Sequence, residues 1–97
     1  MQKLPRPLAI RQNVKVDVEI DEDGEIVPKR IFWPGRDGGW REVEKGFKSG
    51  PGVARKAGGA GLRFEVRIEN YIFELFLVEG IFFFERTQQG IIPLRQA

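Results

Sequence analysis

The chemistry open to this chain is limited by the reactive side chains that it contains. Its 97 residues include no histidine and no cysteine. Ser49 is its one serine and Thr87 its one threonine. A Ser-His-Asp or Cys-His arrangement is therefore impossible, and so is a metal site built from histidine or thiolate ligands. Carboxylates, lysine, arginine and Tyr71 are left for acid–base work, and we expect no cofactor and no metal.

A glycine-rich stretch, GPGVARKAGGAGLRF at residues 50–64, carries two adjacent cations, Arg55 and Lys56. A Walker phosphate loop needs Gly-Lys followed by Ser or Thr, and a dinucleotide fingerprint needs a helix after its last glycine. Here Ala57 follows Lys56, and a strand pattern follows Gly61. Arg55 and Lys56 could still contact a phosphate, because glycines let backbone amides approach an anion. We favour the alternative, a connection whose glycines allow a bend or bulge before the next strand.

Aromatic and basic residues also gather around the turn PGRDGG at residues 34–39. Flat rings beside guanidinium groups can stack on exposed nucleic-acid bases. Tryptophans that flank a turn can equally close the core and leave the arginines solvated, which is the interpretation that we favour. The candidate contacts for nucleic acid in this set are Arg30, Trp33, Arg36, Trp40 and Arg41.

The elements that must position these residues all have the pattern of strands. Asn13–Ile20 alternates apolar and polar side chains with a period of two. A second strand is expected over residues 25–33, where Pro28 predicts an edge position or a bulge. Residues 40–48 predict a shorter, weaker strand, and no helical period persists for as many as about ten residues.

The clearest pattern is a three-stranded antiparallel meander from about residue 62 to residue 86. Its strands are Leu62–Glu69, Tyr71–Val78 and Ile81–Arg86. Glu69-Asn70 and Glu79-Gly80 are suited to two-residue hairpin loops, since Asn and Gly tolerate positive φ. We therefore expect an all-β fold, either a small antiparallel barrel or a strongly bent sheet of five or six strands.

Two-residue loops would give the meander a core face and a second face that is too apolar for open water. Either the chain's own ends or a protein partner, such as a second copy, must cover this second face. The candidate partner contacts are Ile72, Phe76, Ile81 and Phe83. The same register aligns Glu65, Glu74 and Glu85, which could bind a divalent cation or supply a general acid. Arg63 and Arg67 would lie diagonal to Glu74 and could instead neutralise it, so an enzyme or metal binder ranks last.

Charge and hydropathy suggest how the chain is divided. The net charge is +2, with a basic middle between an acidic hairpin and a mildly acidic end. We expect a flexible basic arm over residues 1–12, one β domain over 13–87 and a C-terminal tail over 88–97. No apolar run reaches the roughly 20 residues of a membrane helix, and no signal-peptide pattern is present, so we expect a cytoplasmic protein without a membrane partner.

Two segments, ARKAGGAGLRFEVRI at residues 54–68 and EGIFFFE at residues 79–85, carry a resemblance. They resemble a family of short uncharacterised bacterial domains, of the type common in Firmicutes, with a KAGGxGxRYxVRI-like segment. Phe64 replaces the usual tyrosine, and the tryptophan expected near Phe82 is absent. The resemblance implies a compact bacterial β domain and implies no activity.

Together these features predict a non-enzymatic binding module. One interpretation is nucleic-acid binding through the basic, tryptophan-flanked turn and the glycine-rich loop. The alternative is a protein-interaction or homo-oligomerising module that uses the apolar second face of the meander. Salt separates the two, because phosphate binding weakens steeply as salt rises and apolar docking does not.

Overall fold

The computed structural model describes residues 9–53 and 60–97, and every regular element within them is a β-strand. The strands are β1 (Ile10–Asn13), β2 (Lys15–Ile20), β3 (Ile26–Trp33), β4 (Gly39–Glu42), β5 (Lys45–Val53), β6 (Ala60–Ile68), β7 (Tyr71–Val78), β8 (Ile81–Arg86) and β9 (Arg95–Gln96). In this described part no helix is long and apolar enough to cross a membrane. The all-β prediction is confirmed.

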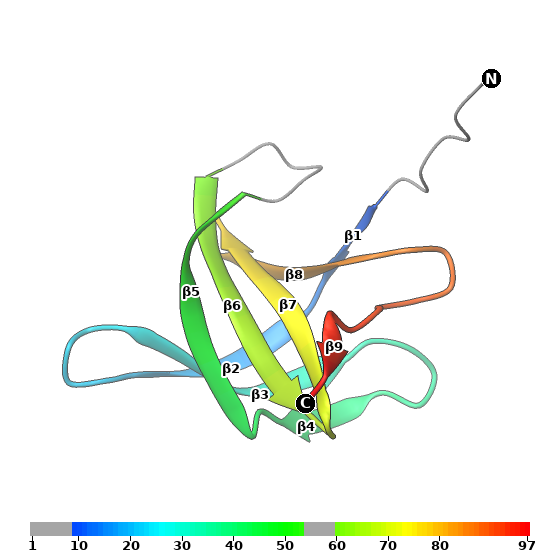
Figure 1. The fold of residues 1–97 in the computed structure, drawn as a ribbon, viewed down its shortest axis with the longest axis horizontal. Helices are drawn as coiled ribbons and strands as arrows, with labels where there is room; N and C mark the ends of the chain where they lie inside the picture. Colours follow the sequence, from blue (N-terminus) through cyan, green and yellow to red (C-terminus); the bar gives the residue numbers. More distant parts are fainter. Residues whose placement is uncertain (1–8, 54–59) are drawn as a thin grey trace.

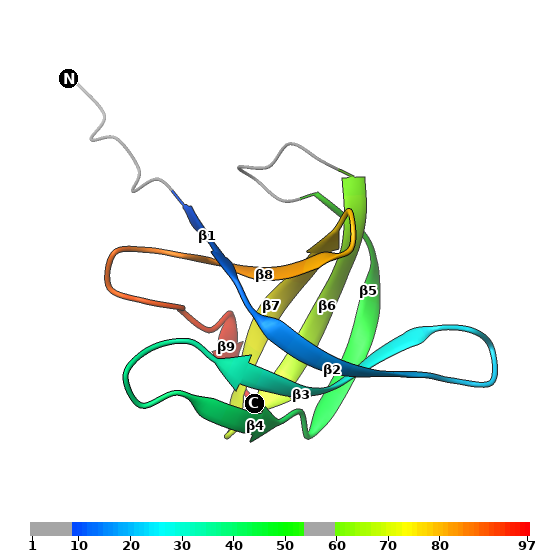
Figure 2. The same cartoon turned by 180° about the vertical axis from the view of Figure 1, so that it is seen from behind.

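The described strands form two antiparallel sheets (Figure 1). The larger sheet has the order β1-β8-β7-β6-β5, with β9 also pairing with β7, and the smaller sheet has the order β2-β3-β4. One residue, Val14, separates β1 from β2, so a nearly continuous strand runs from one sheet into the other (Figure 2). The sheets do not close into a barrel. Of the two predicted forms, the strongly bent sheet fits.

The predicted meander is present as β6, β7 and β8, with the expected register. Ile68 pairs with Tyr71 across the first hairpin, and Val78 pairs with Ile81 across the second. Both residues of each loop have positive φ, at 50° and 70° for Glu69 and Asn70 and at 51° and 78° for Glu79 and Gly80. Two successive left-handed residues give the turn whose twist matches antiparallel strands, which is why these loops set the register.

The main core lies between the meander and the smaller sheet. Its buried members are Ile31, Phe64, Val66, Ile68, Phe73, Leu75 and Phe84. The ring of Trp33 packs against this cluster, with its centroid 5.0 Å from that of Phe73 and 5.4 Å from that of Phe84. Trp33 therefore packs against the core. The sequence analysis favoured a core position for both tryptophans, and for Trp33 this is what the structure shows.

The β2–β3 hairpin contains the irregularity that Pro28 predicted. The pairing of the two strands shifts beside Val18 and Pro28, and Lys29 is the residue inserted in the resulting bulge. The edge position is wrong, because β3 is the central strand of its sheet. Beyond the bulge the hairpin extends past the other strands (Figures 1 and 2), and Val18 and Ile20 are exposed there.

The single strand predicted over residues 40–48 is in fact two strands in different sheets. β4 ends at Glu42 and β5 begins at Lys45. Between them, the Val43 amide donates to the carbonyl of Lys29 in β3, and the next amide, of Glu44, donates to the carbonyl of Arg67 in β6. The chain therefore changes its pairing partner, and its sheet, over two residues.

Both ends of the described chain are more regular than the predicted arm and tail. Residues 10–12, assigned to a flexible arm, lie in β1 and pair with β8. In the predicted tail, the amides of Leu94 and Ala97 donate to the carbonyls of Ile72 and Asn70, each at 2.7 Å. β8 pairs with β7 only from Leu75 onward, so β9 takes the edge of β7 that β8 leaves open.

Candidate binding surfaces

Three side chains form an exposed cluster on the outer face of the smaller sheet, and we call it the outer aromatic cluster. Phe32 and Trp40 are cross-strand partners whose rings meet edge to face, with centroids 5.3 Å apart. Both remain well exposed, at 43% and 41% of their surface. The guanidinium carbon of Arg30 lies 4.6 Å from the centre of the Trp40 ring. The sheet thus presents two aromatic rings and a cation together on one side.

The positive charge in this cluster is balanced by its neighbours. The Arg30 Nε donates to Asp17 Oδ2 at 2.9 Å, and Nη2 donates to the same oxygen. Glu42 is the cross-strand partner of Arg30 on β4, and Lys15 is the partner of Phe32 on β2. Arg30 and Lys15 therefore lie beside the two carboxylates, and the charges of the cluster and its neighbours sum to zero.

The five residues predicted to contact nucleic acid around the turn do not lie together in the structure. Trp33 faces the core, where the guanidinium carbon of Arg41 lies 4.6 Å from its ring centre and Arg41 Nη1 lies 3.7 Å from Glu69 Oε2. Arg36 is exposed in the turn between β3 and β4. The predicted set therefore gives one Arg–Trp pair on each side of the sheet, so it does not form one surface.

The sequence analysis missed Phe32, although the strand period contained the signal. Phe32 alternates with the core residues Ile31 and Trp33, and the short turn brings it opposite Trp40. The predicted phosphate contacts Arg55 and Lys56 lie outside the described residues.

The apolar second face of the meander is largely closed. Phe76 and Phe83 stack with centroids 5.6 Å apart, and their exposed fractions are 2% and 1%. The guanidinium carbon of Arg11, from β1, lies 4.1 Å from the centre of the Phe83 ring and covers it. The prediction that Phe76 and Phe83 offer a surface to a partner is therefore wrong. Of the same set, Ile72 is half-buried and Ile81 is exposed.

Two members of the predicted carboxylate row, Glu65 and Glu74, lie side by side and are neutralised by arginines, whereas Glu85 lies beyond the paired part of β7 and β8 and is the cross-strand partner of Arg11 in β1. Glu65 and Glu74 are cross-strand partners, and Arg63 bonds to both, through Nη2 at 3.1 Å to Glu65 Oε2 and through Nε to Glu74 Oε2. Arg95 Nη2 donates to the other Glu65 oxygen at 2.6 Å. Arg67, the second candidate neutraliser, pairs instead with Glu44, Nε to Oε2, at 3.1 Å. Over the described residues, no group of three or more Asp, Glu, His or Cys could hold a metal ion.

These contacts also determine how Glu65 titrates. The hydrogen bond from Arg95, with that from Arg63, lowers the pKa of Glu65 below its usual value, although burial opposes the shift. A general acid at neutral pH needs a raised pKa, so that it holds a proton to give. Glu65 is shifted in the opposite direction, which disfavours it as the acid of a carboxylate-based enzyme.

A Glu65→Gln variant is expected to lose about 1.5–2 kcal/mol of unfolding free energy at pH 7, the lower part of the range for a hydrogen bond to a charged group. A carboxylate whose pKa is lowered by folding stabilises the fold above its unfolded pKa, near 4.3, and this contribution is lost as pH falls through the folded pKa. The deficit of the variant should therefore shrink between about pH 5 and pH 2. Urea unfolding across this range measures it.

The matched control is Glu22→Gln, in the exposed turn of the β2–β3 hairpin. This variant should follow the wild type at every pH. If the Glu65→Gln deficit were as large at pH 2 as at pH 7, the ion pairs around Glu65 would not be its source.

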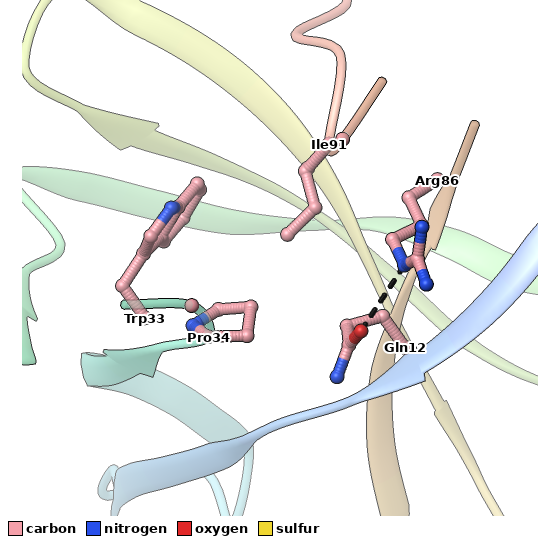
Figure 3. A pocket seen from close by; sticks show the side chains of 7 residues that line it. Gln12, Trp33, Pro34, Arg86 and Ile91 are labelled. Carbon is pink, nitrogen blue, oxygen red and sulfur yellow. Dashed lines mark hydrogen bonds between the residues drawn. The ribbon is translucent and has the colours of Figure 1, made fainter. Parts of the chain in front are cut away.

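A pocket of about 280 Å³ lies between the turn that follows β3 and the connection that follows β8. It is lined by Gln12, Trp33, Pro34, Gly35, Arg86, Gly90 and Ile91. Figure 3 shows Trp33 and Arg86 on opposite sides, with the side chain of Ile91 pointing between them. The pocket therefore has an apolar side and a cationic side, and the sequence analysis did not find it because its residues come from four separate segments.

Comparison with known proteins gave no match of any kind: no protein-family model, no curated protein and no solved structure matches this chain. The resemblance of residues 54–68 and 79–85 to short bacterial domains stays a prediction.

Proposed function

We propose that this chain is a non-enzymatic binding module that holds a protein partner on its outer aromatic cluster. The observation that carries the proposal is the joint exposure of Phe32, Trp40 and Arg30 on one side of a three-stranded sheet. Trp, Tyr and Arg are the residue types that most often supply the binding energy of protein interfaces. The sheet fixes their spacing, so a partner would meet a preformed surface. In keeping with the sequence analysis, we place this module in the cytoplasm of a bacterium.

Charge favours a protein over a nucleic acid as the partner. Nucleic-acid affinity comes largely from lysines and arginines that neutralise phosphates. On the outer side of the smaller sheet, the described charges balance. The cations are Lys15, Lys29 and Arg30, and the acids are Asp17, Glu19 and Glu42. Such a face suits a partner that presents an apolar side chain among charges of both signs, and it offers a polyanion no net attraction.

Selection of random displayed peptides on the intact domain tests this proposal. Peptides that bind the cluster should lose at least about tenfold in affinity when Trp40 or Phe32 is replaced by alanine, as expected for hot-spot rings. Raising NaCl from about 50 to 500 mM should change their affinity only about threefold, because the contact is mainly apolar. The matched control is Tyr71→Ala, since Tyr71 has the same 43% exposure as Phe32 but lies in the larger sheet.

Two results would overturn the proposal. One is that every selected peptide binds the Trp40→Ala and Phe32→Ala variants as well as the wild type, while circular dichroism shows both variants folded. The other is that a single-stranded DNA 12-mer binds at low salt, depends on Trp40 and loses affinity by about a hundredfold or more as salt rises. The second result would make the module a nucleic-acid binder, with Arg55 and Lys56 as the next residues to replace.

A further inference from the structure

We propose that the pocket between Trp33 and Arg86 binds a carboxylate joined to a small apolar group. A free organic acid and the C-terminal end of a peptide both have this chemistry. The site is separate from the outer aromatic cluster, because Trp33 faces the opposite side of β3 from Phe32. It therefore goes beyond the proposed function, and it does not require that function to be correct.

The guanidinium of Arg86 supplies the anion-binding side of the pocket. Among the residues that line it, all of them in the described part, Arg86 is the charged one. Its Nε donates to Gln12 Oε1 at 3.1 Å (Figure 3). Its Nη1 donates to the backbone carbonyl of Thr87 at 3.0 Å. Both acceptors are neutral. The group is thus held in place by contacts that leave its positive charge for a ligand.

Five other arginines in the described part of the chain are paired with carboxylates. Arg30, Arg41, Arg63, Arg67 and Arg95 each lie within ion-pair distance of a carboxylate. A carboxylate matches the fork of a guanidinium, and such charge-assisted hydrogen bonds are stronger than neutral ones. The neutral anchors of Arg86 therefore distinguish it from these five, and they suit it to an external carboxylate.

The opposite side of the pocket is apolar. Trp33, Pro34 and Ile91 form it, and the Trp33 ring is supported from behind by Phe73 and Phe84. Ligand pockets typically measure about 300–1,000 Å³. At about 280 Å³, this one is below that range and suits a small ligand. One aliphatic or aromatic group beside a carboxylate fits both its size and its two-sided lining.

The rim of the pocket is held by short hydrogen-bonded turns. The amides of Thr87 and Gly90 donate to one another's carbonyls at 3.0 and 3.1 Å, which closes the turn before Ile91. On the other side, the amide of Gly38 donates to the carbonyl of Gly35 at 3.1 Å. A site that is already ordered loses less entropy on binding, so these turns favour measurable affinity for a small ligand.

Titration of the ¹⁵N-labelled domain with N-acetyl-leucine tests the inference, with N-acetyl-leucinamide as the probe that lacks the carboxylate. The acid should cause saturable shifts in the Trp33 indole and in the amides of Gly90 and Ile91, and the amide probe should not. Arg86→Gln should weaken binding at least about tenfold, as expected when a charge-assisted hydrogen bond is lost. Lys29→Gln removes the same charge from the β2–β3 hairpin and should leave affinity within about twofold.

A pentapeptide that ends in leucine with a free carboxylate separates the two sources of the ligand. Clearly tighter binding than N-acetyl-leucine would indicate a peptide end, and equal affinity would indicate a small acid. If Arg86→Gln did not fold, Ile91→Ala on the apolar side should still weaken the acid severalfold. Three results would overturn the inference: no saturable shift by 20 mM acid, equal binding of acid and amide probes, or unchanged affinity in a folded Arg86→Gln or Ile91→Ala variant.

Discussion

Replacing Phe84 with alanine is expected to cost about 3–5 kcal/mol of unfolding free energy, the range measured for removing a buried phenylalanine ring. Phe84 is fully buried, and its ring lies 5.4 Å from that of Trp33 and 6.1 Å from that of Phe73. Domains of this size are stable by only about 5–15 kcal/mol, so the variant should unfold at a much lower urea concentration. Urea unfolding followed by circular dichroism measures the loss.

Phe32→Ala is the matched control, because it removes the same ring from a position that is 43% exposed. It should change stability by no more than about 1 kcal/mol, since a ring that stays 43% exposed leaves no closed cavity when it is removed. Equal losses in the two variants would contradict the assignment of Phe84 to the core and of Phe32 to a binding surface.

Replacing Gly61 with alanine is expected to cost about 2 kcal/mol or more, the upper part of the range for an added methyl group in a packed interior. Gly61 lies in β6 beside β7, where an alanine Cβ would be 2.3 Å from the Leu77 carbonyl oxygen and 2.8 Å from Val78 Cγ2. The first of these atoms belongs to the backbone of a paired strand, so β6 and β7 would have to separate. Urea unfolding of the variant measures this cost.

The control is Gly24→Ala, in the exposed turn of the β2–β3 hairpin. An alanine Cβ there meets nothing within 4 Å, so the left-handed φ of 80° is its only penalty, about 1 kcal/mol. A Gly61→Ala variant as stable as the wild type would contradict the close approach of β6 to β7. If the predicted cost is found, packing explains Gly61, the last glycine of the stretch at residues 50–64, without a ligand.

Turn residues and strand alternation, both readable from short stretches of sequence, were sufficient to predict the meander of β6, β7 and β8. The pairs Glu69-Asn70 and Glu79-Gly80 accept positive φ, and a two-residue loop then leaves one register for the strands on either side. The same register correctly predicted that Glu65 and Glu74 lie side by side and that Arg63 could neutralise Glu74. Such features depend on residues that are near neighbours in sequence or across one short turn.

Features that depend on distant segments were not predictable in this way. Alternation shows that a strand has two different faces, and it does not show which segment covers each face. The sequence therefore left open whether the chain's own ends or a partner covers Phe76 and Phe83, whereas the structure shows both rings buried, with Arg11 from β1 over the Phe83 ring. The two residues of β9 are both exposed, so the segment has no apolar alternation that would predict a strand. It forms a strand because it pairs with the edge of β7 that β8 leaves open.

The candidate sites show the same division. By itself, the sequence determined which chemistry is absent, the strand pattern and the two tight hairpins of the meander, and it limited Pro28 to an edge position or a bulge. Only the tertiary structure decided that Trp33 packs in the core while Trp40 is exposed, and that Gln12, Trp33, Arg86 and Ile91 surround one pocket. The physical reason is that strand period and turn type depend on residues close together in the sequence. Burial and pocket formation depend on which strands from distant parts of the chain pack against each other, and a local sequence pattern carries no information about that.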